Sequence, residues 1–91
     1  MKPVRIYTTT YCSFCSQAKD LLRRKGIAFE EIDVTEDPQT RDQLVEMTGG
    51  LRTVPQIWIG TTHVGGYSDL ARLEREGRLN ALLAEGASAG A

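Results

Sequence analysis

The two cysteines of the chain, Cys12 and Cys15, lie three residues apart in the segment "TYCSFC". Such a pair has three ordinary uses: half of a zinc site, a structural disulfide, or a redox pair that closes and reopens. A zinc site needs about four ligands. The chain adds only one histidine, His63, so a second subunit would have to complete that site. Two cysteines are also too few for the disulfide framework of a small secreted domain. The pattern therefore favours a redox pair over a zinc half-site, a structural disulfide or two inert thiols.

The position of the pair predicts different roles for its two members. Residues at i and i+3 of a helical turn have Cα atoms within the range of about 4.4–6.8 Å that a disulfide requires. Cys12 stands where a strand-like run ends and helical periodicity begins. It would face unpaired N–H groups and the positive end of the helix dipole, which favour its thiolate form. We therefore expect Cys12 to attack a disulfide and Cys15, one turn inside the helix, to resolve the product.

The surrounding sequence predicts alternating strands and helices. Period-2 and β-branched runs indicate strands, and apolar spacing of three and four residues indicates helices. Asp37 is the expected N-cap of the second helix and Pro38 lies in its first turn. The expected strands are 3–9, 27–34, 53–60 and 62–64, and the expected helices are 13–25, a second within 35–50, a third from about Ser68, and 78–86. The first helix would place Phe14, Ala18, Leu21 and Leu22 on one face.

This order predicts an α/β fold in one domain, residues 1–91, with a frayed tail at about 86–91. A β-α-β start joins two parallel strands, and the last two strands are close enough for a hairpin. The result is a four-stranded mixed sheet covered by helices. Cys12 would then lie at the carboxyl end of the first strand, where α/β sheets usually bind ligands.

Charge and the N-terminal segment limit the classes of partner. Eleven basic residues against twelve acidic ones give no excess of positive charge, so we expect no nucleic-acid partner. The segment "MKPVRIY" contains no apolar run long enough for a signal peptide or a membrane span. We therefore expect a cytoplasmic protein with no membrane partner, whose thiols are kept reduced.

Three motifs in the same order and spacing resemble the glutaredoxin family. They are the CxxC pair, "TVP" at 53–55 and "GGYSD" at 65–69, and the resemblance extends over residues 3 to about 84. It implies a thioredoxin-like three-layer sandwich with helices on both faces of the sheet. It also implies a monomeric, glutathione-dependent oxidoreductase that reduces protein–glutathione mixed disulfides and some protein disulfides. A thioredoxin-like dithiol reductase is a lesser alternative, because the WCGPC motif and the extra N-terminal β-α unit of thioredoxins are missing.

The resemblance also implies a set of glutathione contacts. Pro55 would be cis and lie against the cysteines, and Val54 would offer its backbone N–H and C=O to the cysteinyl part of glutathione. The helix that begins in "GGYSD" would bind the γ-glutamyl carboxylate at its N-terminus, and Asp69 would take the neighbouring ammonium group. The predicted contacts are Tyr11, Phe14, Arg52, Thr53, Val54, Pro55, Gly66, Tyr67, Ser68 and Asp69. The alternatives are an edge strand starting at 53–55 and ordinary helix capping by Ser68 and Asp69.

Two departures from the family pattern bear on function. Many glutaredoxins carry lysine at the position of Thr9, and Arg52 is the expected substitute cation here. Dithiol glutaredoxins usually have Pro-Tyr between the cysteines, whereas this chain has Ser13 and Phe14. Some family members with Ser or Gly at the first of these positions assemble a [2Fe–2S] cluster between two subunits. The alternative function is therefore a cluster-bridged dimer, in which Cys12 of each subunit and bound glutathione would be the ligands.

Overall fold

The computed structural model describes residues 2–89 of the chain, with side chains described through Ala84. Four strands and four helices alternate as the sequence predicts. They are β1 (Val4–Thr8), α1 (Ser13–Arg24), β2 (Glu30–Asp33), α2 (Pro38–Met47), β3 (Gln56–Ile59), β4 (Thr62–Gly65), α3 (Tyr67–Arg75) and α4 (Leu79–Ala89). The sheet order is β2-β1-β3-β4, with β1 parallel to β2 and antiparallel to β3, and with β3 antiparallel to β4. The predicted four-stranded mixed sheet is confirmed.

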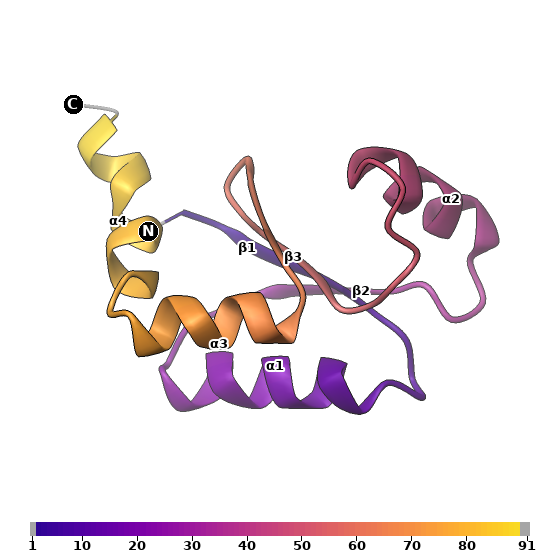
Figure 1. The fold of residues 1–91 in the computed structure, drawn as a ribbon, viewed down its shortest axis with the longest axis horizontal. Helices are drawn as coiled ribbons and strands as arrows, with labels where there is room; N and C mark the ends of the chain where they lie inside the picture. Colours follow the sequence, from indigo (N-terminus) through magenta and orange to yellow (C-terminus); the bar gives the residue numbers. More distant parts are fainter. Residues whose placement is uncertain (1, 90–91) are drawn as a thin grey trace.

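Helices cover both faces of the sheet. In Figure 1, α1 and α3 run side by side below the sheet, while α2 lies on the opposite side. Side chains alternate along a strand, so Ile6 of β1 packs toward α1 and α3, whereas Tyr7 packs toward α2. The larger core also includes Ile57 of β3 and Leu70 of α3. The thioredoxin-like three-layer arrangement expected from the resemblance is therefore confirmed.

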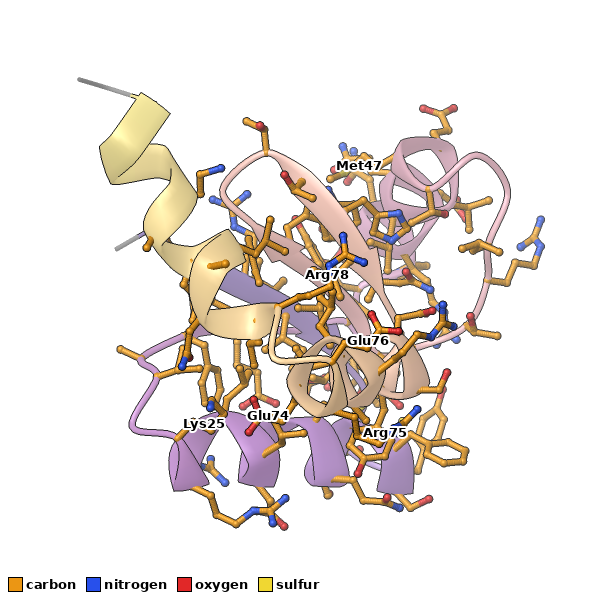
Figure 2. All side chains as sticks on the ribbon, turned by 60° about the vertical axis from the view of Figure 1, so that its left-hand side comes forward. Lys25, Met47, Glu74, Arg75, Glu76 and Arg78 are labelled. Atoms are coloured by element: carbon orange, nitrogen blue, oxygen red, sulfur yellow. The ribbon has the colours of Figure 1, made fainter. Side chains whose placement is uncertain are left out.

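The buried face of α1 differs from the predicted one at its first turn. Cys15, Ala18 and Leu22 lie at i, i+3 and i+7 and are buried together. Phe14 was expected on this face, but its side chain is 58% exposed. The helical period places it at the edge of the buried stripe, and Cys15 takes the inner position. At the other end of α1, the Lys25 ammonium lies 2.9 Å from a carboxylate oxygen of Glu74 on α3 (Figure 2).

Several predicted boundaries need correction. The second strand covers only Glu30–Asp33, and the third begins at Gln56, after Pro55, which has no N–H to donate to a strand ladder. Since β3 lies inside the sheet, residues 53–55 do not begin an edge strand. The third helix begins one residue earlier than expected, at Tyr67.

The C-terminal segment is helical through Ala89, which includes part of the predicted tail at 86–91. Residues 90–91 lie outside the described residues, and fraying of the tail stays a prediction. Among residues 2–89, no helix combines the length and apolar character needed to cross a membrane.

Candidate active site

Cys12 occupies the N-cap position of α1. Its backbone is extended, with φ −103° and ψ 111°, and its Sγ accepts the backbone N–H of Cys15 at 3.1 Å. The thiol is half-buried and donates to the carbonyl oxygen of Val54 at 3.4 Å. The sequence lacks Ser, Asp or Asn at this cap, so a sulfur atom takes the place of the usual capping oxygen. Cys12 is thus a free thiol placed at the positive end of a helix and reachable from solvent.

Cys15 has a very different environment one turn further on. Its side chain is only 1% exposed. Burial is the main cause that raises the pKa of the Cys15 thiol to about 12, and the hydrogen bond to Cys12 raises it further. The Thr9 backbone and the Lys19 ammonium act in the opposite direction, with smaller effect. Cys15 is therefore a neutral thiol at neutral pH, in agreement with the predicted asymmetry of the pair.

The loop before β3 forms the wall opposite Cys12. The Val54–Pro55 peptide bond is cis, as the resemblance implied, and Pro55 is buried. The Val54 carbonyl faces the Cys12 thiol. Chain segments more than forty positions apart in sequence are therefore brought into contact at the sulfur.

A groove of about 200 Å³ adjoins this wall. The rings of Phe14 and Tyr67 stack beside it, with centroids 6.3 Å apart and an angle of 21° between the planes. This contact joins the CxxC turn to the start of α3. The lining residues are Phe14, Thr53, Val54, Pro55, Gly66, Tyr67 and Ser68. All of them belong to the predicted set of contacts, and Tyr11, Arg52 and Asp69 lie outside the lining.

The N-terminus of α3 closes one end of the groove. Gly66 is the N-cap residue and has no side chain with which to cap the first turn. Its N–H is donated to the Asp69 carboxylate at 3.0 Å. Gly65 has φ +116°, and a Cβ there would collide with that carboxylate, so glycine is required for this turn. Asp69 is thus a capping residue, while N–H groups of the first helical turn remain available to an external acceptor.

One cation that contacts the loop of residues 9–12, the cysteine loop, was not singled out by the sequence. Arg41 of α2 donates to the Tyr11 hydroxyl at 3.1 Å and to the carbonyl oxygen of Arg52 at 3.3 Å. Arg52, the predicted cation, is exposed and takes part through its backbone. Thr9, at the family's lysine position, is 4% exposed, and its hydroxyl has no hydrogen-bond partner among the described residues. Arg41 could not be found by sequence, since the motif spacing does not show which side of α2 meets the cysteine loop.

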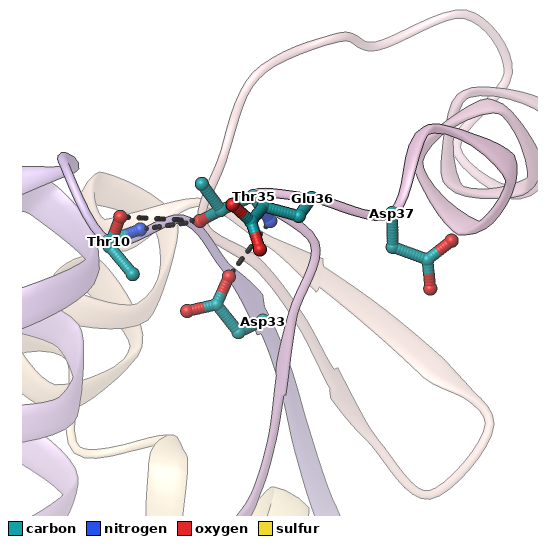
Figure 3. A pocket seen from close by; sticks show the side chains of 5 residues that line it. All are labelled: Thr10, Asp33, Thr35, Glu36 and Asp37. Atoms are coloured by element: carbon teal, nitrogen blue, oxygen red, sulfur yellow. Dashed lines mark hydrogen bonds between the residues drawn. The ribbon is translucent and has the colours of Figure 1, made fainter.

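A larger hollow of about 510 Å³ lies near the carboxyl end of β2, beyond Thr10 (Figure 3). Its polar lining is held together by hydrogen bonds from the Thr10 N–H to the Thr35 hydroxyl and from the Thr35 N–H to Asp33. Three carboxylates, of Asp33, Glu36 and Asp37, line it. The smaller groove is the better candidate site because it adjoins the Cys12 thiol and a helix N-terminus.

The site combines an accessible thiol at a helix N-cap with a buried thiol one turn later, and a proline loop lies against them. This arrangement characterises a thiol–disulfide oxidoreductase. Comparison with known proteins agrees with this class. The glutaredoxin family model matches residues 4–64, two thirds of the chain. The chain belongs to the glutaredoxin family.

Individual relatives match over most of their own length. A glutaredoxin of Pseudomonas aeruginosa is 55% identical over 83 residues, which cover 91% of this chain and 98% of the relative. The solution structure of glutaredoxin from Brucella melitensis has a TM-score of 0.83 and 49% identity, covering 94% of this chain and 92% of that one. A crystal structure of a buckwheat glutaredoxin–glutathione complex has a TM-score of 0.85 and 31% identity, covering 92% and 78%.

Proposed function

We propose that this protein is a glutathione-dependent oxidoreductase that reduces protein–glutathione mixed disulfides and some protein disulfides. The observation that carries the proposal is the position of the Cys12 thiol, at a helix N-cap and against the Val54 carbonyl, beside the groove that ends at α3. The buckwheat relative, which was solved as a complex with glutathione, supports glutathione as the ligand.

In this proposal glutathione lies along the groove with its sulfur next to Cys12. The Val54 backbone pairs with the cysteinyl part, and the N-terminus of α3 receives the γ-glutamyl carboxylate. Asp69 keeps its cap on Gly66 through one oxygen, while the other oxygen lies 3.4 Å from Arg72 in an exposed ion pair. Because such exposed pairs are weak, the ligand's ammonium group can replace Arg72 at little cost. Arg41 supplies positive charge at the opposite end, toward Tyr11.

The reaction consists of two thiol–disulfide exchanges. The Cys12 thiolate attacks the glutathione sulfur of the mixed disulfide, the protein thiolate leaves, and glutathione remains bonded to Cys12. A second glutathione thiolate then attacks that glutathione sulfur, which releases Cys12 and forms glutathione disulfide. For protein disulfides, the Cys12 thiolate first attacks one sulfur of the substrate disulfide and releases the other as a thiolate. Cys15 then attacks the Cys12 sulfur, the bond to the substrate breaks, and the Cys15 proton passes to a released substrate thiolate. The products are the reduced substrate and a Cys12–Cys15 disulfide, which glutathione reduces.

Two matched variants test this function. Turnover of a glutathionylated peptide with glutathione should be lost in Cys12→Ser and retained in Cys15→Ser, because glutathione itself performs the second step. Reduction of a peptide disulfide should be lost in both variants, which serves as the internal control. Equal loss of deglutathionylation in both would refute the proposed reaction and favour the thioredoxin-like dithiol reductase.

A cluster-bridged dimer is the second candidate, and the first turn of α1 favours it. Ser13 is exposed and stands where a proline would stiffen the turn. Each chain offers one accessible thiol, since Cys15 is buried. Among the described residues no group of three or more His, Cys, Asp or Glu side chains could hold a metal ion. Four sulfur ligands for a [2Fe–2S] centre would therefore come from Cys12 of two chains and two glutathione molecules.

Anaerobic reconstitution with iron, sulfide and glutathione tests the cluster candidate. A brown dimer is expected, and Ser13→Pro should lower its yield while thiol exchange is retained. A colourless monomer under these conditions would remove the candidate.

We propose further that the protein works in the cytoplasm, where thiols are kept reduced. There it acts as a monomer on glutathione and on proteins that carry glutathione or disulfides. Cell fractionation and size-exclusion chromatography of the reduced protein test these two points.

A further inference from the structure

Gln56, the residue after Pro55, has a buried polar side chain that forms hydrogen bonds with two exposed residues, Thr53 and His63. It is 2% exposed, so its amide needs partners. The amide nitrogen donates to the Thr53 carbonyl oxygen at 3.0 Å and to the Thr53 hydroxyl at 3.2 Å. Because a carbonyl oxygen can only accept, this contact fixes which end of the amide faces Thr53. The amide oxygen of Gln56 must therefore face the other way.

That oxygen meets His63 of β4. The distance between Oε1 of Gln56 and Nε2 of His63 is 2.7 Å. His63 lies opposite Trp58 in the strand register, and the two rings stack with centroids 4.6 Å apart and 28° between planes. Since the Gln56 oxygen cannot donate, the proton of this bond must be on Nε2 of His63. The stack with Trp58 and this bond together hold the imidazole in one orientation.

The network ends at the wall of the proposed groove. Thr53 and Val54 lie in the loop before β3, outside the ladder of strand hydrogen bonds. The Gln56 amide holds both the backbone and the side chain of Thr53. Val54 follows directly, and its carbonyl accepts the Cys12 thiol. The orientation of the Val54 backbone is thus connected, through Thr53 and Gln56, to a histidine that does not line the groove.

We propose that Gln56 and His63 are positioning residues for the Val54 backbone, and that they set the affinity for the glutathionyl part of the substrate without taking part in the chemistry. The inference rests on the proposed function and adds to it a structural determinant of substrate binding. Loss of the His63 donor would leave the buried Gln56 oxygen unpaired, so the amide would turn or move and release Thr53. The N–H contact that Cys15 makes to the attacking Cys12 sulfur does not depend on Gln56 and would be kept, whereas the contact of that sulfur with the Val54 carbonyl would change with the loop.

Three substitutions separate positioning from packing. His63→Phe keeps a ring to stack on Trp58 and removes the donor, whereas His63→Gln restores a side-chain N–H. Thr62→Ala, on an exposed position of the same strand, is the control. His63→Phe should raise KM for a glutathionylated peptide about three- to tenfold, the usual effect of one buried hydrogen bond, with kcat within about twofold. His63→Gln should recover most of this loss, and Thr62→Ala should match the wild type. The rate of Cys12 alkylation by iodoacetamide should change less than KM in His63→Phe, because the Cys15 N–H contact to the sulfur is kept.

Nitrogen chemical shifts of the His63 ring give a second readout that needs no substrate. The neutral ring in the wild type should carry its proton on Nε2, and a proton on Nδ1 would overturn the inference whatever the kinetics. An unchanged KM in His63→Phe, a fall in kcat alone, or failure of His63→Gln to recover would overturn it as well. These results differ from failure of the proposed function, in which the wild type itself would not turn over the glutathionylated peptide. In that case the statement about KM is refuted together with the function.

Discussion

The ionisation of Cys15 can be tested in isolation from Cys12. In a Cys12→Ser variant Cys15 is the only thiol of the chain. Its pKa is raised from an ordinary 9.0 to about 12, with burial as the first cause and the hydrogen bond to Cys12 as the second. The variant loses the second cause and keeps the first, because the buried position of Cys15 on α1, 1% exposed, does not depend on the Cys12 sulfur.

The expected effect on reactivity is large. At pH 8 a thiol with a pKa of 9.0 is about one tenth thiolate, whereas one with a pKa of about 12 is about one ten-thousandth thiolate. Alkylation by iodoacetamide requires the thiolate. The roughly thousandfold difference in thiolate is the largest slowing that ionisation can cause, because the variant lacks the hydrogen bond to Cys12, and Cys15 in the folded variant should react more than about tenfold more slowly than in urea. Thiolate absorbance of the folded variant should likewise be weaker at pH 8 than in urea and rise at higher pH.

The Cys15→Ser variant supplies the control, because its half-buried Cys12 should alkylate readily in the folded state. Rates for Cys15 within tenfold of each other in buffer and in urea would refute the reasoning. They would mean that the first turn of α1 opens often enough to expose the inner thiol, and that burial does not separate the roles of the pair.

Four other predictions concern the surroundings of the pair. Arg41→Ala should raise KM for a glutathionylated peptide about two- to fivefold in steady-state kinetics, since it removes two hydrogen bonds between the cysteine loop and the loop before β3. Asp69→Ala should lower the free energy of unfolding in urea by about 1 kcal/mol through loss of the Gly66 cap, while Asp69→Asn keeps the cap; a rise of KM in both would assign the carboxylate charge to ligand binding. Thr9→Val removes a buried hydroxyl that has no partner among the described residues and should raise the melting temperature by about 4–8 °C, and a decrease would mean that the hydroxyl is paired in solution. Because the pKa of Cys15 is raised in the folded state, its burial costs no stability below the ordinary pKa of 9.0 and lowers the free energy of unfolding as pH rises from there toward 12. The free energy of unfolding of the reduced protein should therefore fall more steeply above pH 9 than that of Cys15→Ser.

The sequence predicted the fold well because its strongest patterns are local. Strand-forming runs, the apolar spacing of α1 and the cap at Asp37 each depend on neighbouring residues, and the four strands, α1 and the Asp37 cap all appear in the structure. Periodicity predicted Phe14 on one face with Ala18, Leu21 and Leu22, whereas in the structure Phe14 is 58% exposed. A residue at the margin of an apolar stripe can pack inward or along the surface, and the presence of Tyr67 on the neighbouring helix decides for the surface.

The candidate site was predictable where motifs mark it and unpredictable where it depends on contacts across layers. "TVP" and "GGYSD" located the groove, because both segments shape the backbone itself. Arg41 and His63 were missed, since each acts through a contact between separate elements: Arg41 with the cysteine loop and His63 with Gln56 of the adjacent strand. These contacts depend on the register between neighbouring strands and on how a helix packs over the cysteine loop, and a single sequence predicts neither.

The polar groups that the proposed complex uses are chiefly backbone groups at Val54 and at the start of α3. In the proposed complex the ligand meets the Val54 backbone and the N–H groups at the start of α3, which no side-chain substitution removes directly. Side chains act on these groups by holding them in place, as the Gln56 amide holds Thr53 and the Asp69 carboxylate holds Gly66. We therefore expect residues behind the groove to change affinity as much as residues that line it. A substitution scan that reports KM and kcat separately should place the largest KM effects at Gln56 and Asp69 and smaller effects at the exposed Ser68, and the reverse order would show that lining side chains hold the ligand directly.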